Sequence, residues 1–141
     1  PMDRLAEALS AADLAVVCLE PGHTGISVPS KAYGVLASGR PILGILDADG
    51  EIGQMIKETG CGVLVEPDPG EIAAAIRELA ADEEARAAMG EAGRTAFLER
   101  YTLAHAAAAY DAALASMLAG EIDARAPRGP RVGGGEDQYA P

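Results

Sequence analysis

The chain has 141 residues, of which 49% are hydrophobic and 23% charged, and it carries a formal net charge of −11. This size and composition match one globular domain and argue against a disordered or fibrous protein. The negative charge, the absence of Trp and the single Phe argue against a nucleic-acid partner, because nucleic acids are bound by basic surfaces and stacking aromatic rings.

Three features bear on the compartment and on the ends of the chain. The sequence shows neither about 18 consecutive apolar residues nor a basic start followed by an apolar run, so we expect a cytoplasmic chain. It opens with Pro1 and reaches a helix–strand pattern almost at once, from which we expect a truncated sequence; a start codon at Met2 is the alternative. Cys18 and Cys61 each lie in an apolar run, which predicts small buried side chains rather than ligands or a disulfide.

The spacing of apolar residues predicts the secondary structure. Short continuous apolar runs are typical of strands buried on both faces, and apolar residues three and four apart indicate helices. Beyond Gly120 there is almost nothing to bury, so we expect a domain over 1–118 and a flexible tail over 119–141. In chain order the predicted elements are helix 4–12, strand 13–19, helix 29–39, strand 41–46, helix 51–59, strand 62–65 and helices 69–80, 82–100 and 103–117.

Residues at the helix ends support these boundaries. Gly39 and Gly60 stand where a helix ends, Gly60 in a left-handed conformation. Asp68 can cap the helix over 69–80, with Glu71 as its capping-box partner. We expect the last three helices to be packing elements, including the stripe that begins at Leu103.

The order of the elements predicts the fold class. Strands separated by helices imply right-handed crossovers and a parallel sheet, so we expect an α/β fold: a Rossmann-like sheet of about three strands with flanking helices. Such a short sheet leaves an unpaired edge. Ligands bind beyond the carboxyl ends of parallel strands, which here are the loops 20–28, 47–51 and 66–68.

The first of these loops is the strongest candidate for a binding site. Its sequence, GHTGISVPSK from Gly22 to Lys31, contains glycines that let the backbone approach a ligand and leads into a helix. The first N–H groups of a helix attract phosphate, Ser30 adds a hydroxyl and Lys31 a positive charge. The residues therefore predict a diphosphate cradle; ordinary glycine punctuation before a helix is the alternative.

Two linked blocks carry a family resemblance. They are LSAADLAVVCLEPGHTGISVPSKAYGVLASGRPILGILDADGEI and GCGVLVEPDPGEIAAAI. The chain from Leu9 to Met117 resembles the C-terminal domain of family 4 glycosyltransferases with the GT-B fold, and within them the bacterial polysaccharide-assembly enzymes of colanic-acid type. The PSK…Y…LA.GRP block is the most specific part of this resemblance.

The resemblance implies a nucleotide-diphospho-sugar donor, often a UDP-sugar, held in the cleft between two Rossmann-like domains. The start of the helix near Pro29 would face the phosphates. Carried over by position, the donor-binding residues would be Gly25, Ile26, Ser27, Val28, Pro29, Ser30 and Lys31, with His23, Gly34 and Glu51 as further candidates.

The chain departs from the family pattern at two positions. Many members have Glu where this chain has Ile26 and Gly34, so no catalytic residue is assigned. His23 either touches the donor sugar or is a solvated loop residue. Glu51 either faces the nucleotide or serves the helix start by its charge, and Lys31 either contacts phosphate or is a surface lysine.

We therefore expect the donor-binding part of a retaining glycosyltransferase for cell-surface polysaccharide or lipid-linked glycan synthesis. It would be inactive alone, because the N-terminal acceptor-binding domain is missing, and the full enzyme would act at the inner face of the membrane. No metal or cofactor is implied, because no carboxylates or histidines cluster at ligand spacing. The alternatives are a fragment of a sugar-nucleotide 2-epimerase and a non-enzymatic helical interaction module.

Overall fold

The computed structural model describes residues 4–120 of the chain. The tail predicted over 119–141 lies, from residue 121 onward, outside the described residues. The contacts divide the chain into two compact units, Pro1–Thr102 and Leu103–Pro141. The sheet and its flanking helices all belong to the first unit.

The centre of the first unit is a three-stranded parallel sheet in the order β1–β2–β3. Its strands are β1 (Ala15–Cys18), β2 (Ile42–Ile45) and β3 (Gly62–Leu64). In register, Ala15 lies opposite Ile42, which lies opposite Gly62. The predicted α/β fold with a short Rossmann-like sheet is confirmed.

Every helix predicted in the described part of the chain forms, with ends shifted by a few residues at most. The largest change at a start concerns α2, where the turn through Pro29 and Ser30 is tight. The N–H groups of Ala32 and Tyr33 donate three residues back, at 3.0 and 3.2 Å, as in a 3₁₀ turn. The helices are α1 (Leu5–Ser10), α2 (Lys31–Ser38), α3 (Glu51–Thr59), α4 (Pro69–Ala81), α5 (Glu83–Arg100) and α6 (Leu103–Leu118).

The predicted helix ends are present in the structure. Gly39 and Gly60 both have φ of 68° and end α2 and α3 in the left-handed conformation that favours glycine. Asp68 accepts hydrogen bonds from the N–H groups two and three residues on, at 2.8 and 3.0 Å. Glu71 does not close the box on Asp68, because its carboxylate accepts from the N–H of Glu66, at 3.4 Å.

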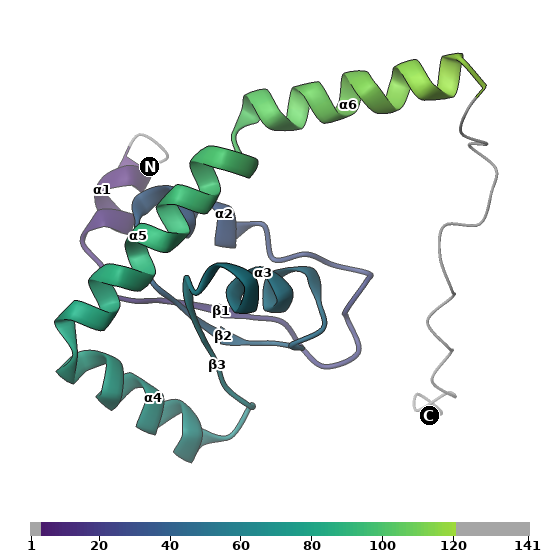
Figure 1. Cartoon of the computed structure of the whole chain (residues 1–141). Helices are drawn as coiled ribbons and strands as arrows, with labels where there is room; N and C mark the ends of the chain where they lie inside the picture. The colour runs from purple at the N-terminus through teal and green to yellow at the C-terminus, as the bar shows by residue number, and fades with distance from the viewer. Residues whose placement is uncertain (1–3, 121–141) are drawn as a thin grey trace, which may run out of the picture. The chain divides into compact units, whose positions relative to one another are not determined.

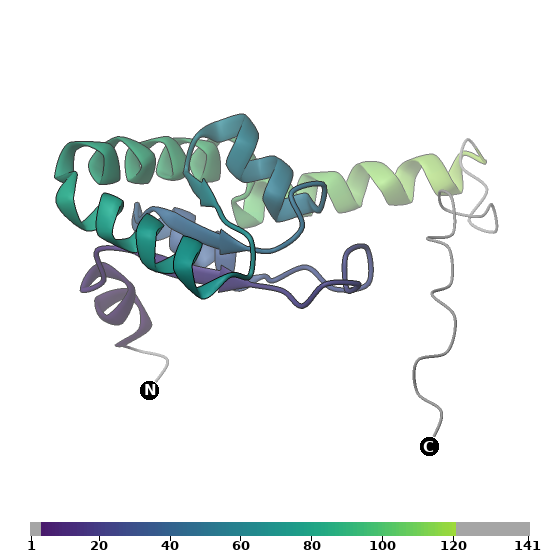
Figure 2. The same cartoon turned by 90° about the horizontal axis from the view of Figure 1, so that it is seen from below.

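The core lies between one face of the sheet and the helices α2, α3 and α5. In Figures 1 and 2 the strands run between α3 and α4, so the sheet has helices on both sides. Helix α5 packs closely on α2: a Cβ added at Gly90 would overlap the carbonyl oxygen of Gly39, and Arg94 donates to the carbonyl of Ala37. The core cluster consists of Val17, Ala32, Val35, Leu36, Ile42, Ile52, Met55, Ile56 and Cys61.

Strand β1 is buried on one face only, which corrects two expectations. Val17 is fully buried, but Val16 is 47% exposed and Cys18 is exposed. The prediction of a strand buried on both faces is therefore wrong for β1, and so is the prediction of a buried Cys18; Cys61 is fully buried as expected. Leu43, the register partner of Val16 on the central strand, is fully buried, so this face of the sheet is covered over β2 and open over β1.

Helix α6, considered by itself, forms as predicted but has no buried residue. The exposed fraction is 86% for Leu103 and 73% for Tyr110, both on the predicted apolar stripe. These values describe the helix by itself, so the expectation that it is a packing element stays a prediction: helical spacing predicts a helix and not the surface that covers it. None of the helices in residues 4–120 has the length and apolarity that crossing a membrane requires.

The two cysteines should differ sharply in reactivity. We expect a thiol reagent to modify Cys18 in the folded chain and to reach Cys61 only after unfolding, because burial shields Cys61 and raises the pKa of its thiol. Mass spectrometry of the labelled chain over time measures both rates. The Cys18→Ser variant should show no fast-reacting thiol, and rapid labelling of Cys61 in that variant would contradict the described core.

Replacing Gly90 by Ala should destabilise the fold. A Gly-to-Ala change in a helix ordinarily stabilises the fold by up to about 1 kcal/mol. At position 90, however, the added methyl would overlap the Gly39 carbonyl. We expect the free energy of unfolding in urea to fall by roughly 1–3 kcal/mol, as for overpacked sites. The control Glu91→Ala, at an exposed neighbour, should stay within about 0.5 kcal/mol; stabilisation by Gly90→Ala would contradict the close packing.

Candidate functional site

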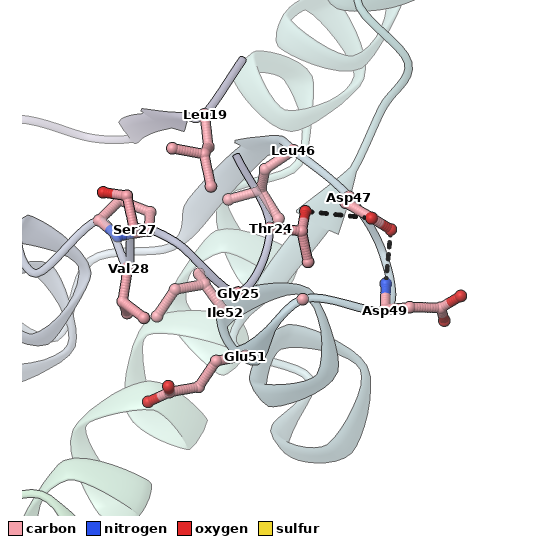
Figure 3. Close-up of a pocket in the computed structure, with 12 residues that line it drawn as sticks. Leu19, Thr24, Gly25, Ser27, Val28, Leu46, Asp47, Asp49, Glu51 and Ile52 are labelled. Carbon is pink, nitrogen blue, oxygen red and sulfur yellow. Dashed lines mark hydrogen bonds between the residues drawn. The ribbon is translucent and has the colours of Figure 1, made fainter. Parts of the chain in front are cut away.

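A pocket of about 290 Å³ lies at the carboxyl end of the sheet, where the loops after β1 and β2 meet the start of α3. Figure 3 shows Leu19 and Leu46 on one side of this pocket, and the Glu51 carboxylate on the other. The position agrees with the rule that ligands bind beyond the carboxyl ends of parallel strands. The lining residues are Leu19, Thr24, Gly25, Ser27, Val28, Pro29, Leu46, Asp47, Asp49, Gly50, Glu51 and Ile52.

The loop after β1 folds back on itself before it enters α2. The N–H groups of Ile26 and Ser27 both donate to the carbonyl of His23, at 3.1 and 3.0 Å. This turn leaves the Thr24 hydroxyl free to donate to the Asp47 carboxylate, at 3.1 Å. The hydrogen bond ties the loop after β1 to the turn after β2, as the dashed line in Figure 3 shows.

Asp47 organises the turn that follows β2. Its Oδ1 accepts from the N–H of Asp49 at 2.9 Å, and its carbonyl accepts from the N–H of Gly50 at 3.1 Å. The Asp49 N–H, and next the Thr24 hydroxyl, lower the pKa of the Asp47 carboxyl, because both bonds favour its charged form. Asp47 is therefore a fixed anion at the pocket wall.

The same turn is pressed against the first turn of α3. A Cβ added at Gly53 would overlap the carbonyl oxygen of Asp47 and the backbone of Ala48. Only a residue without a side chain lets α3 begin this close to the turn, so the position of Glu51 at the pocket rim follows from Gly53.

Glu51 is held by a tyrosine from another helix. The hydroxyl of Tyr33, on α2, donates to Glu51 Oε1 at 2.6 Å. The Tyr33 ring packs against the ring of Tyr101, with 5.2 Å between centroids and 48° between planes. Burial, and then the hydrogen bond to Glu51, raise the pKa of Tyr33, so its hydroxyl stays protonated and acts as the donor.

The structure brings half of the predicted donor-binding residues together at this pocket. Those that line it are Gly25, Ser27, Val28, Pro29 and Glu51. Their contact with a donor stays a prediction, but they share one concave surface with the start of α2.

The other predicted residues lie outside the lining. Ile26 is 80% exposed, and Lys31 and His23 are exposed as well. Gly34 faces α1, since a Cβ there would lie 3.7 Å from Leu9 Cδ1. Ser30 sits at the cap position of α2 and its side chain makes no cap hydrogen bond. The roles predicted for these residues stay predictions.

The charge of the pocket differs from that of a simple phosphate cradle. Asp47, Asp49 and Glu51 contribute three carboxylates, and no basic side chain is among its lining residues. Carboxylates accept hydrogen bonds from hydroxyl groups and repel phosphate oxygens. In residues 4–120 no three His, Cys, Asp or Glu side chains are grouped so that they could hold a metal ion.

The sequence pattern nominates the loop over 47–51 but does not single out Thr24, Asp47 or Tyr33. An Asp directly after a buried strand and two residues before a second Asp is a signal for a side-chain-stabilised turn. Tyr33 stands in the PSK…Y…LA.GRP block, but the block does not reveal its partner, because Glu51 lies 18 residues away in sequence. The third nominated loop contributes Glu66 and Pro67 to a second hollow of about 300 Å³.

The fold and the pocket define a Rossmann-like α/β domain with a ligand site at the carboxyl end of its sheet. The family model described as Glycosyl transferase-like matches residues 1–112. The chain therefore belongs to the glycosyl transferase-like family.

A protein from Pseudomonas aeruginosa described as "Probable glycosyltransferase WbjE" is 44% identical to the chain over 72 residues. The matched segment is 50% of this chain and 18% of that protein, so the chain spans under a fifth of the relative it matches. No solved structure matches the chain significantly.

The pKa of Asp47 should report the contact between the two loops. Because the carboxyl pKa is lowered in the folded chain, the Asp47 bonds are fully present at neutral pH and are lost as the pH falls below about 4, through the lowered value. We expect Thr24→Val to raise the Asp47 titration midpoint, measured by carbon NMR of its carboxyl group, without removing the larger effect of the Asp49 N–H. Ser27→Ala removes a hydroxyl of the same pocket and should leave the midpoint unchanged; an equal midpoint in wild type and Thr24→Val would argue against the loop contact.

Proposed function

We propose that this chain binds a nucleotide-diphospho-sugar, with a UDP-sugar as the preferred donor, as the donor-binding part of a retaining glycosyltransferase. The observation that carries the proposal is the pocket at the carboxyl end of the sheet, bordered by the loop that leads into α2. Family membership over residues 1–112 makes a sugar nucleotide the ligand class to test first.

The arrangement around the pocket supports a division of the ligand into two parts. The phosphates lie toward the start of α2, where helix N–H groups and the exposed Lys31 favour negative charge. The uncharged, hydroxyl-rich part lies in the acidic pocket. The pocket volume is at the low end for small-molecule sites, which suits one part of a donor rather than the whole of it.

The finer assignment rests on the resemblance of the PSK…Y…LA.GRP block. On this resemblance, the full protein is proposed to be a GT-B enzyme of family 4, close to the colanic-acid type. It would act in cell-surface polysaccharide or lipid-linked glycan synthesis at the inner face of the membrane. The donor-binding part contributes to transfer by holding the leaving diphosphate electrostatically. The acceptor would be bound by an N-terminal domain outside this sequence.

A second candidate, a helical interaction module, has one observation in its favour. The apolar stripe of α6 is exposed in the described residues, with Leu103 at 86%, Tyr110 at 73% and Leu114 at 55%. Exposed apolar stripes of this kind mark association surfaces. This role would be independent of nucleotide binding and is compatible with it.

Calorimetry with the folded 141-residue chain tests the main proposal. We expect saturable binding of UDP-glucose that weakens with rising ionic strength, because charge contributes to the grip on the diphosphate. Among GDP-mannose, dTDP-glucose and UDP-glucose, the last should bind most tightly. A folded sample that binds none of these ligands would overturn the proposal and favour the interaction module.

Lys31→Ala should weaken binding of UDP-glucose about threefold to tenfold, which corresponds to one partly solvated contact between an ammonium and a phosphate. Arg77→Ala is the matched control, because Arg77 is exposed on α4 and absent from the pocket lining. Equal affinities for wild type and Lys31→Ala would remove the phosphate role of this residue.

A further inference from the structure

We propose that Tyr33 is a positioning residue that holds the Glu51 carboxylate as an acceptor for a hydroxyl group of the bound nucleotide sugar. The inference rests on the proposed function and deepens it, because it assigns the ligand's hydroxyl-bearing part to one named side chain. Tyr33 is the Y of the PSK…Y…LA.GRP block, but the resemblance assigns this residue no role.

Glu51 keeps one of its two carboxylate oxygens available. One carboxylate oxygen, Oε1, accepts from Tyr33 at 2.6 Å, and no described residue donates to Oε2. A carboxylate offers about four lone-pair positions, so Glu51 keeps most of its accepting capacity. Because Glu51 lines the pocket, this capacity is available to a ligand.

The other two pocket carboxylates, Asp47 and Asp49, are engaged elsewhere. Asp47 accepts from Thr24 and from the N–H of Asp49, and so serves the wall itself. Asp49 pairs with Lys57 at 3.5 Å. Among the lining residues, Glu51 is therefore the carboxylate left for recognition.

Tyr33 is held in place by its helix and by a neighbouring ring. Tyr33 is anchored on α2, two positions before the buried Val35, and its ring rests against Tyr101 at the end of α5. A long Glu side chain at an exposed helix start is otherwise free to rotate, and fixing it costs conformational entropy. The hydrogen bond from the Tyr33 hydroxyl fixes the Glu51 side chain before a ligand binds. A ligand then loses less binding free energy to ordering this side chain, which is how preorganised sites gain affinity.

A simpler role for Glu51 is to stabilise the start of α3 by its charge. That role needs only proximity to the helix N-terminus and no partner on another helix. The 2.6 Å bond across 18 residues of sequence, between α2 and the rim of the pocket, is what the simpler role leaves unexplained.

The ligand chemistry is a hydroxyl that donates to a carboxylate. Phosphate oxygens are excluded from this position because they carry negative charge and only accept. A nucleotide sugar has hydroxyl groups at its ribose and at its hexose, and both are the same chemistry for Glu51. Affinities for UDP-glucose, UDP and 2′-deoxy-UDP distinguish the ribose from the hexose.

The experiment measures affinities of the 141-residue chain for UDP-glucose, UDP and 2′-deoxy-UDP by calorimetry, for wild type, Tyr33→Phe, Glu51→Gln and the double variant. We expect Glu51→Gln to weaken the binding of UDP-glucose about tenfold, as for the loss of a hydrogen bond to a charged group. Tyr33→Phe should weaken the same binding about threefold. In the double variant the loss should equal that of Glu51→Gln alone, because Tyr33 acts only through Glu51.

The ligand series identifies which hydroxyl is bound. A contact to the ribose 2′-hydroxyl gives the same loss of affinity for UDP-glucose and UDP and little loss for 2′-deoxy-UDP, whereas a contact to the ribose 3′-hydroxyl gives the same loss for all three ligands. A hexose contact gives the loss for UDP-glucose alone. Each pattern supports the proposal, provided that Tyr33→Phe shows it too, in weaker form.

Matched controls separate positioning from general damage. Glu58→Gln changes a carboxylate on the same helix that pairs with Arg100 outside the pocket, and Tyr110→Phe removes an exposed hydroxyl on α6; both should bind like wild type. Thermal unfolding should place all variants near the wild-type midpoint, since Tyr33→Phe keeps the ring stack.

Two results would overturn the inference while leaving nucleotide binding intact. These are unchanged affinity in Glu51→Gln and losses that add in the double variant. A wild-type chain that binds none of the three ligands would instead overturn the proposed function, and the inference with it.

Discussion

The site depends on one anchored residue, Asp47, which joins two loops and a helix at the carboxyl end of the sheet. Its carboxylate accepts from Thr24 and from the N–H of Asp49, while its carbonyl lies against the backbone of Gly53. Hydrogen bonds to a charged acceptor are stronger than neutral ones. With Asp47 fixed, the pocket has a defined wall, and Glu51 begins α3 at its rim.

Charge is separated across the proposed site. The pocket lining carries three carboxylates, and Pro29, just before α2, lines it as well, whereas Lys31 at the start of α2 is exposed outside the lining. A ligand with one anionic part and one hydroxyl-rich part matches this separation, because each part meets the groups that favour it. The same separation would disfavour an inorganic phosphate inside the pocket, which distinguishes this site from a glycine-rich phosphate loop.

The described residues also expose apolar surface at two places. Val16 and Cys18 face solvent on the open side of β1, and the stripe of α6 has no buried member. The sequence predicts that both segments are buried. An apolar run or stripe, however, does not reveal which neighbouring segment covers it. The sheet edge and the exposed helix are therefore properties of the tertiary arrangement, and the matched relative is a much longer protein.

The order and type of the elements, the parallel sheet and the ends of α2 and α3 at Gly39 and Gly60 could all be predicted from the amino-acid sequence. These follow from local rules of periodicity, capping and backbone conformation, each read within a few residues. The sequence also nominated the loops at the strand ends. The sequence could not predict the bonds of Glu51 to Tyr33 and of Asp47 to Thr24, because they join segments 18 and 23 residues apart. Nor could it predict that Lys31 lies outside the pocket lining, because that depends on how the helices and loops pack.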